Sequence, residues 1–174
     1  MKNTKKMVIT ALCMAIGIIL PITLHAIPNA GSILLPMHIP VLLCGLICGP
    51  VYGVICGVMT PFLSSLLTGM PPAAYLPSMI FELLVYGLIA GLMMILLKEK
   101  KGMAKYYVAL ISAMVLGRIV FGIMNACFFQ AGNYSLSIWM TAAFVTAFPG
   151  IVIQLILIPV IMVALQKAHL TETL

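Results

Sequence analysis

Long apolar stretches separated by short polar segments dominate the pattern of this chain. A bilayer core of ~30 Å takes about 20 apolar helical residues. The stretches that reach or approach this length are Met7–His25, Ile39–Leu67, Leu76–Leu97, Tyr106–Phe129 and Met140–Leu165. The second is too long for one crossing and is interrupted at Gly49-Pro50, while Pro149 and Pro159 predict kinks in the last. The pattern therefore predicts an all-α integral membrane protein.

The lysines indicate how often the second stretch crosses the membrane. All of them lie at the start of the chain, in Lys98–Lys105 or near the end at Lys167. Positively charged segments stay on the cytoplasmic side, so an even number of crossings separates the first two clusters. We therefore expect Ile39–Leu67 to form two short helices joined at Gly49-Pro50, rather than a re-entrant hairpin. This gives one domain, 1–174, with six transmembrane helices and both termini in the cytoplasm.

Composition supports this class and excludes others. Hydrophobic residues make up 64% of the 174 and charged residues 7%, against roughly 25% charged in an ordinary soluble domain. The net charge of +6 comes from lysines beside apolar segments, which is the pattern of cytoplasmic membrane flanks rather than of nucleic-acid binding. No Walker lysine, His-Glu-x-x-His or Gly-x-Ser-x-Gly motif is present, so we expect no enzyme, cofactor or metal site. The cysteines lie in apolar stretches and are expected to be buried thiols: Cys13, Cys44, Cys48, Cys56 and Cys127.

Two charged side chains lie within the apolar stretches, Glu82 and Arg118. A charge in the hydrocarbon region costs at least a few kcal/mol and usually marks function. The guanidinium of an arginine matches a carboxylate or phosphate with two parallel hydrogen bonds. The partner of Arg118 is therefore either Glu82, in a structural ion pair, or an anionic substrate. A proton relay through Glu82 is a third interpretation.

Further polar residues fall near these two charges. A helical rise of 1.5 Å per residue places Gln154 in about the same membrane layer. Asn125 lies on the helix face of Arg118, and Tyr86 lies on the helix face of Glu82. The candidate substrate-binding residues are Arg118, Glu82, Asn125, Gln154, Tyr86 and, at the outer end of its helix, His38.

Aromatic and small residues are given structural roles. Tyr134 and Trp139 lie near the outer end of the last helix and are interpreted as interface anchors rather than ligand contacts. Glycines spaced four residues apart are expected to let helices pack closely. These are Gly45, Gly49, Gly53, Gly57, Gly87 and Gly91.

Three segments carry a resemblance to a known family. They are LPMHIPVLLCGLICGPVY (Leu35–Tyr52), TPFLSSLLTGMPP (Thr60–Pro72) and FELLVYGLIAGL (Phe81–Leu92). Over nearly its whole length the chain resembles the substrate-binding S component of energy-coupling factor (ECF) vitamin transporters, in the group with pantothenate- and pyridoxine-type members. The resemblance implies a six-helix protein of the bacterial plasma membrane. Such a protein captures a small vitamin from outside and associates with a transmembrane coupling subunit and two ATPase subunits.

The resemblance also implies where the chain contacts the coupling subunit and where it binds the substrate. Helix 1 of such proteins contacts the coupling subunit through a small-xxx-small motif, which Ala11 and Ala15 occupy here in ALCMA. The substrate is expected near the outer face, under the loops Ala26–Met37 and Thr68–Tyr75. Because arginine favours a carboxylate, pantothenate leads, with a pyridoxine-type or other small vitamin as the runner-up. A stand-alone proton-coupled or facilitative transporter that uses Glu82 remains the alternative.

Overall fold

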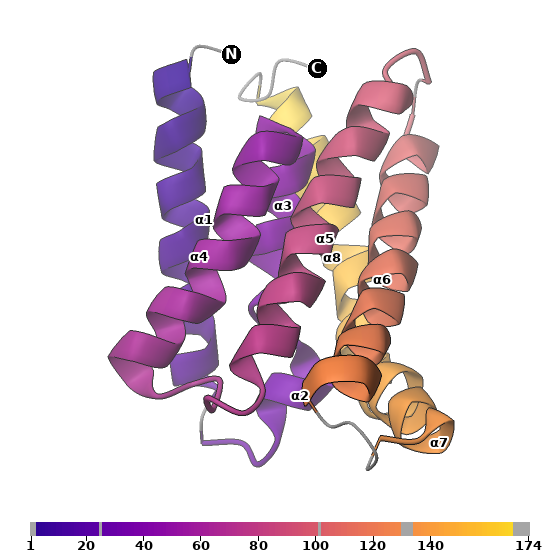
Figure 1. Cartoon of the computed structure of the whole chain (residues 1–174). Coiled ribbons are helices and arrows are strands. Elements are labelled where there is room, and N and C mark those ends of the chain that lie inside the picture. The colour runs from indigo at the N-terminus through magenta and orange to yellow at the C-terminus, as the bar shows by residue number, and fades with distance from the viewer. Residues whose placement is uncertain (1–2, 25, 101, 130–133, 169–174) are drawn as a thin grey trace.

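The computed structural model describes residues 3–24, 26–100, 102–129 and 134–168, and every described element is helical (Figure 1). The elements are α1 (Asn3–Thr23), α2 (Ala30–Leu34), α3 (His38–Cys48), α4 (Pro50–Thr68), α5 (Leu76–Leu96), α6 (Ala104–Met124), the π-helix η1 (Asn125–Phe129), α7 (Leu136–Met140), the π-helix η2 (Thr141–Thr146) and α8 (Phe148–Lys167). Among the described residues, six apolar helical segments are long enough to cross a membrane, with α2 and α3 counted as one. The predicted six-helix membrane fold is confirmed.

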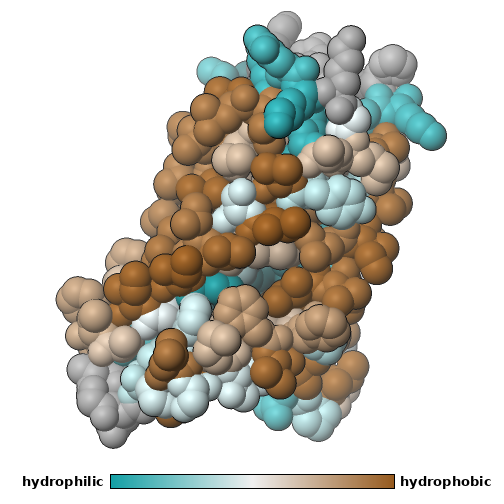
Figure 2. All heavy atoms as spheres, turned by 90° about the vertical axis from the view of Figure 1, so that its right-hand side faces the viewer, coloured by the Kyte–Doolittle hydropathy of each residue, from teal (hydrophilic) through white to brown (hydrophobic). Residues whose placement is uncertain are grey.

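The helices form one bundle with two distinct ends. The start of α1, the end of α8 and the α5–α6 connection lie at one end, and α2, α7 and the α4–α5 connection lie at the other (Figure 1). We call the first the lysine end, because it carries Lys5, Lys6, Lys98, Lys105 and Lys167. Figure 2 shows hydrophilic residues gathered at this end and a hydrophobic surface along the body of the molecule. The chain thus has the charge pattern and surface of a multi-pass membrane protein.

The break between α3 and α4 lies where Gly49-Pro50 predicts it. Gly49 has φ 93° and ψ 179°, a backbone conformation that is essentially restricted to glycine. Pro50 follows in the first turn of α4, where its missing N–H has no helical partner to lose. The first of the two helices is short, with 11 residues in α3, whereas α4 has 19.

Glycines bring α4 and α5 into backbone contact. A Cβ at Gly53 would collide with the Gly87 carbonyl oxygen, and a Cβ at Gly87 would collide with the Gly53 carbonyl. A Cβ at Gly57 would collide with the Leu83 backbone in the same way. The expectation that these glycines allow close packing is confirmed, and α4 and α5 are in direct backbone contact.

The last predicted helix differs from the structure. Residues Thr141–Thr146 are π-helical, and α8 begins only at Phe148. Pro149 therefore stands in the first turn of a new helix, which proline tolerates, and does not kink a longer one. Pro159 does lie inside α8. An apolar segment is compatible with either an α-helix or a π-helix, so the hydrophobic pattern could not reveal that Thr141–Thr146 is π-helical.

Other expectations need smaller corrections. The first helix begins at Asn3, and its predicted end, His25, lies outside the described residues. The predicted outer loop before His38 contains the short helix α2. Four cysteines are buried as expected, but Cys127 is exposed, because η1 lies where the chain leaves the end of α6.

Candidate functional site

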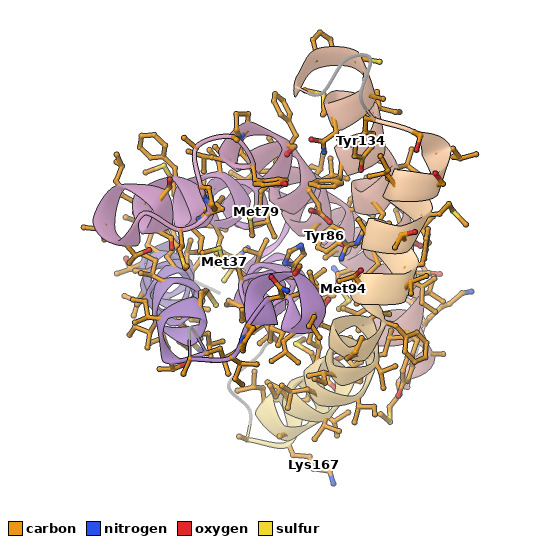
Figure 3. All side chains as sticks on the ribbon, turned by 90° about the horizontal axis from the view of Figure 1, so that it is seen from below. Met37, Met79, Tyr86, Met94, Tyr134 and Lys167 are labelled. Atoms are coloured by element: carbon orange, nitrogen blue, oxygen red, sulfur yellow. The ribbon has the colours of Figure 1, made fainter. Side chains whose placement is uncertain are left out.

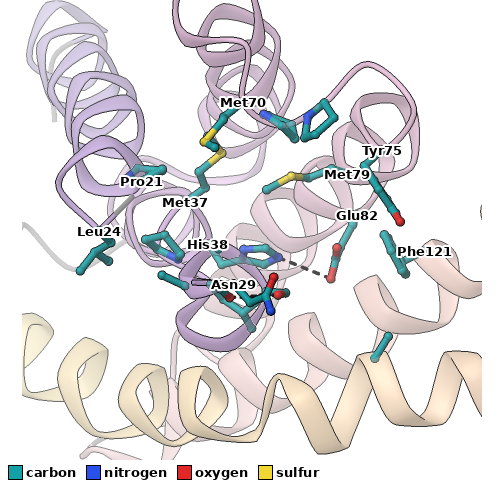
Figure 4. A pocket seen from close by; sticks show the side chains of 18 of the residues that line it. Pro21, Leu24, Asn29, Met37, His38, Met70, Tyr75, Met79, Glu82 and Phe121 are labelled. Atoms are coloured by element: carbon teal, nitrogen blue, oxygen red, sulfur yellow. Dashed lines mark hydrogen bonds and ion pairs between the residues drawn. The ribbon is translucent and has the colours of Figure 1, made fainter. Parts of the chain in front are cut away.

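A cavity of about 680 Å³ lies in the half of the bundle opposite the lysine end (Figure 4). Its lining comes from the end of α1, the segment through α2 to the start of α3, the α4–α5 connection, α5, α6 and η2. Most lining side chains are apolar, and Met37, Met70 and Met79 form part of the wall. Viewed from the end opposite the lysines, Met37 and Met79 lie toward the middle of the bundle (Figure 3). Flexible thioethers adapt to ligand shape, so this wall suits the carbon skeleton of a small molecule.

Three polar side chains from three helices meet at the cavity: His38 of α3, Glu82 of α5 and Arg118 of α6. One carboxylate oxygen of Glu82, Oε1, lies 3.1 Å from Nη1 of Arg118 and 3.5 Å from Nε2 of His38. Figure 4 shows the contact between His38 and Glu82 as a dashed line. All three residues are almost fully buried, with 5% or less of each exposed. The predicted meeting of Glu82 and Arg118 is therefore present in the structure.

The guanidinium of Arg118 is only partly used. Nη1 faces Glu82, but Nε and Nη2 have no hydrogen-bond partner among the described residues. These two N–H groups point in parallel along one edge of the guanidinium, which is the edge that binds a carboxylate with two hydrogen bonds. Leaving buried donors of a charged group unpaired is costly. This edge of Arg118 is therefore able to bind an acceptor that the described residues do not supply.

Tyr86 supports this cluster without lining the cavity. Its ring meets the His38 ring edge to face, with centroids 5.0 Å apart. It also covers Gly117 so closely that a Cβ there would collide with the ring. Tyr86 therefore fixes the orientation of His38 and brings α5 close to α6, one residue before Arg118.

The remaining two candidates are buried away from the cavity lining. The Asn125 side-chain amide donates to the Phe121 carbonyl oxygen at 2.9 Å, and its own Oδ1 has no partner among the described residues. Gln154 is fully buried on α8, and neither amide atom has a described partner. Depth along a helix does not determine which of its side chains face the cavity, so substrate binding by Asn125 and Gln154 stays a prediction.

A comparison with known families identifies the chain. Residues 5–162 match the family described as "ECF transporter, substrate-specific component". The chain belongs to this family. A search of curated proteins and a search of solved structures each found no match. The family is one of transport proteins rather than enzymes, and its substrate-binding members work with the other subunits of ECF transporters.

In this S component, Ala11 and Ala15 lie on the exposed face of α1. The opposite face of α1 buries Thr10, Cys13 and Gly17 against the bundle. The small residues expected to contact a coupling subunit are therefore accessible, and no neighbouring helix of the described chain covers them.

Several residues around the S component's cavity were not singled out from the sequence. The methionine wall was missed, because methionines in apolar helices are indistinguishable from core residues. Tyr75 and Asn29 also line the cavity. They fall in the two loops that the family resemblance placed over the substrate. Their position in these loops could have identified them as candidate contacts. The Trp139 indole, interpreted as an interface anchor, donates to the Arg118 backbone carbonyl at 2.9 Å.

Proposed function

We propose that this S component captures a small water-soluble vitamin that carries a carboxylate, with pantothenate favoured, and delivers it to an ATP-driven ECF module. The observation that carries the proposal is the Nε and Nη2 edge of Arg118, which has no hydrogen-bond partner among the described residues and belongs to a residue that lines the cavity. A carboxylate would accept both hydrogen bonds, and the apolar wall would receive the rest of the molecule. His38 and Glu82 would serve hydroxyl or amide groups of the ligand.

A purely structural Glu82–Arg118 pair is the alternative, but it does not explain the nitrogens of Arg118 and His38 that lack a hydrogen-bond partner among the described residues. A buried pair is stable when further hydrogen bonds satisfy the remaining donors of the arginine. Here one guanidinium nitrogen faces Glu82, while two others and both ring nitrogens of His38 have no hydrogen-bond partner among the described residues. We therefore propose that the pair presets the position of Arg118 and that the ligand completes its hydrogen bonds.

A panel of vitamins tested by thermal shift on the purified protein would examine this function. Pantothenate should raise the melting temperature, because a ligand that binds only the folded state stabilises it. Pantothenol, in which an alcohol replaces the carboxylate, is the matched control and should have little effect at the same concentration. Equal stabilisation by both compounds would contradict the role of the Arg118 edge. Stabilisation by pyridoxine alone would favour the runner-up.

The proposal also requires the cavity to face outward. We propose that the lysine end is cytoplasmic, because clustered lysines stay on that side of the membrane. Exposed Cys127 would first be changed to serine, leaving the four buried cysteines in place. In that background, Ser137→Cys near the cavity end should react with an impermeant thiol reagent in intact cells. Met103→Cys at the lysine end should react only after lysis, and the reverse pattern would overturn the orientation.

One observation favours a second candidate, a stand-alone proton-coupled transporter. Glu82 lies 3.5 Å from His38, and a buried carboxylate beside an imidazole is able to exchange a proton. Such a protein would take up its substrate along a proton gradient in cells that lack ECF ATPases. The S-component function predicts no uptake in those cells, and co-purification of a larger membrane subunit with two ATPases where these are present.

A further inference from the structure

The buried cluster of Glu82, Arg118 and a neutral His38 is electrically balanced before a ligand binds. The positive charge of Arg118 faces the negative charge of Glu82, with Nη1 and Oε1 3.1 Å apart. A ligand carboxylate on the Nε and Nη2 edge of Arg118 would bring a second negative charge among residues that are at most 5% exposed. An uncompensated charge in buried surroundings is costly. Binding of a carboxylate therefore favours a further positive charge in this cluster.

His38 lies where such a charge would compensate the excess. Its Nε2 atom is 3.5 Å from Oε1 of Glu82, the same oxygen that faces Arg118. Neither nitrogen of the ring has a hydrogen-bond partner among the described residues. The Tyr86 ring holds the imidazole edge to face, with centroids 5.0 Å apart. A proton on His38 would thus place a positive charge beside Glu82 without a movement of the ring.

Few other groups around the cluster are able to take up a proton. The titratable or charged side chains of the cavity lining are His38, Tyr75, Glu82 and Arg118, and Tyr86 packs behind His38. Phenols keep their proton at neutral pH, and a guanidinium does not lose its own. Helix α4 has no charged residue, and the described charges of α1, α6 and α8 other than Arg118 are lysines at the lysine end. This leaves Glu82 and His38, and histidine is the side chain type that accepts a proton between about pH 5 and pH 8.

We propose that His38 takes up a proton from water when a carboxylate binds at Arg118, so that the anion and the proton enter the site together. The proposal rests on the proposed function, because it needs a carboxylate at Arg118. It differs from proton-coupled transport, since the proton sets the affinity and no gradient drives uptake. Binding favours the protonated ring, so affinity should fall as the pH rises through neutrality, by up to about ten-fold per pH unit.

The proton is counted by titration calorimetry with pantothenate in two buffers that differ in ionisation enthalpy. The ligand carboxyl group loses its own proton near about pH 4, so it contributes nothing at neutral pH. At about pH 8 the wild-type protein should take up about one proton per bound pantothenate. His38→Gln should take up none, and its Kd should no longer depend on pH. The same substitution at His169, near the end of the sequence, is the matched control and should behave as the wild type.

A second experiment tests the charge balance without a ligand. Arg118→Met removes the positive charge and leaves the negative charge of Glu82 in excess, as a bound carboxylate would. A proton on His38 then stabilises the folded state, and this stabilisation is lost as the pH rises. The melting temperature of Arg118→Met should therefore fall more steeply than that of the wild type from about pH 6 to about pH 8. Adding His38→Gln should remove the difference in slope.

The outcomes separate this proposal from the proposed function. Pantothenate binding without proton uptake in the wild type would overturn the proposal, and this measurement needs no variant to fold. Proton uptake that persists in His38→Gln would assign the proton to another group and overturn the role of His38. If the wild type binds no pantothenate, the proposed substrate fails, and the ligand-free comparison decides. Equal slopes for the wild type and Arg118→Met would overturn the charge balance, whereas a steeper slope that requires His38 would support it.

Discussion

Replacing Arg118 with methionine is expected to weaken vitamin binding by about 2–5 kcal/mol, the cost of removing one partner from a desolvated charge contact. This corresponds to roughly a 30- to 5,000-fold rise in Kd. The physical reason is that the Nε and Nη2 donors, which have no partner among the described residues, would no longer meet the ligand carboxylate. Isothermal titration of the purified variant with pantothenate measures the loss directly.

Removing Arg118 alone also leaves Glu82 as an unpaired buried charge, so stability must be measured beside affinity. Arg118→Met combined with Glu82→Leu removes both charges and should restore the melting temperature, because an apolar pair replaces a buried ion pair at little cost. That double variant should fold but not bind. Affinity retained in a folded double variant would show that Arg118 serves Glu82 and not the ligand.

The second large effect concerns transport rather than binding. Ala11→Trp with Ala15→Trp should abolish vitamin uptake in cells that express the complete transporter and leave binding by the purified protein nearly intact. Small residues spaced four apart let two membrane helices approach closely, and two indoles on that face would hold the coupling subunit away. Both alanines are exposed on α1, far along the chain from the residues of the charged cluster.

A matched control uses the same substitutions on another exposed face. Ile111 and Val115 are also four residues apart and lie exposed on α6. Tryptophans at these two positions should fit among lipid chains and leave uptake close to that of the wild type. Normal uptake by the Ala11 and Ala15 variant would show that the coupling subunit contacts another surface. Equal loss in both variants would point to a membrane insertion defect.

The features predicted from the sequence share a local physical cause. Helix positions follow from the length of apolar stretches, and the α3–α4 break follows from a Gly-Pro pair whose conformation few residues adopt. The meeting of Glu82 and Arg118 was foreseeable, because two opposite charges in an apolar bundle have few other partners.

The features that the sequence did not reveal depend on how each helix is rotated about its own axis and on contacts between residues far apart in the chain. Depth along a helix could not reveal that Gln154 lies outside the cavity lining. The contact of Trp139 with Arg118 joins residues that are 21 positions apart in the chain, and neither this contact nor the π-helical turns follow from the hydrophobic periodicity. The methionine wall became recognisable only once the cavity was defined.

The backbone contact between Gly53 and Gly87 has a consequence for how this protein can change over evolution. Glu82 lies on the same helix, five residues before that contact, so the carboxylate is carried by a helix in direct backbone contact with its neighbour. Much of the cavity wall comes from the α1–α3 and α4–α5 connections. The first is itself tightly packed, because a Cβ at Gly150 would collide with the backbone of Ile33 and Leu34, whereas nothing lies within 4 Å of a Cβ at Gly69 in the second. We therefore expect residues of the α4–α5 connection to tolerate exchange more readily than those of the helix that carries Glu82.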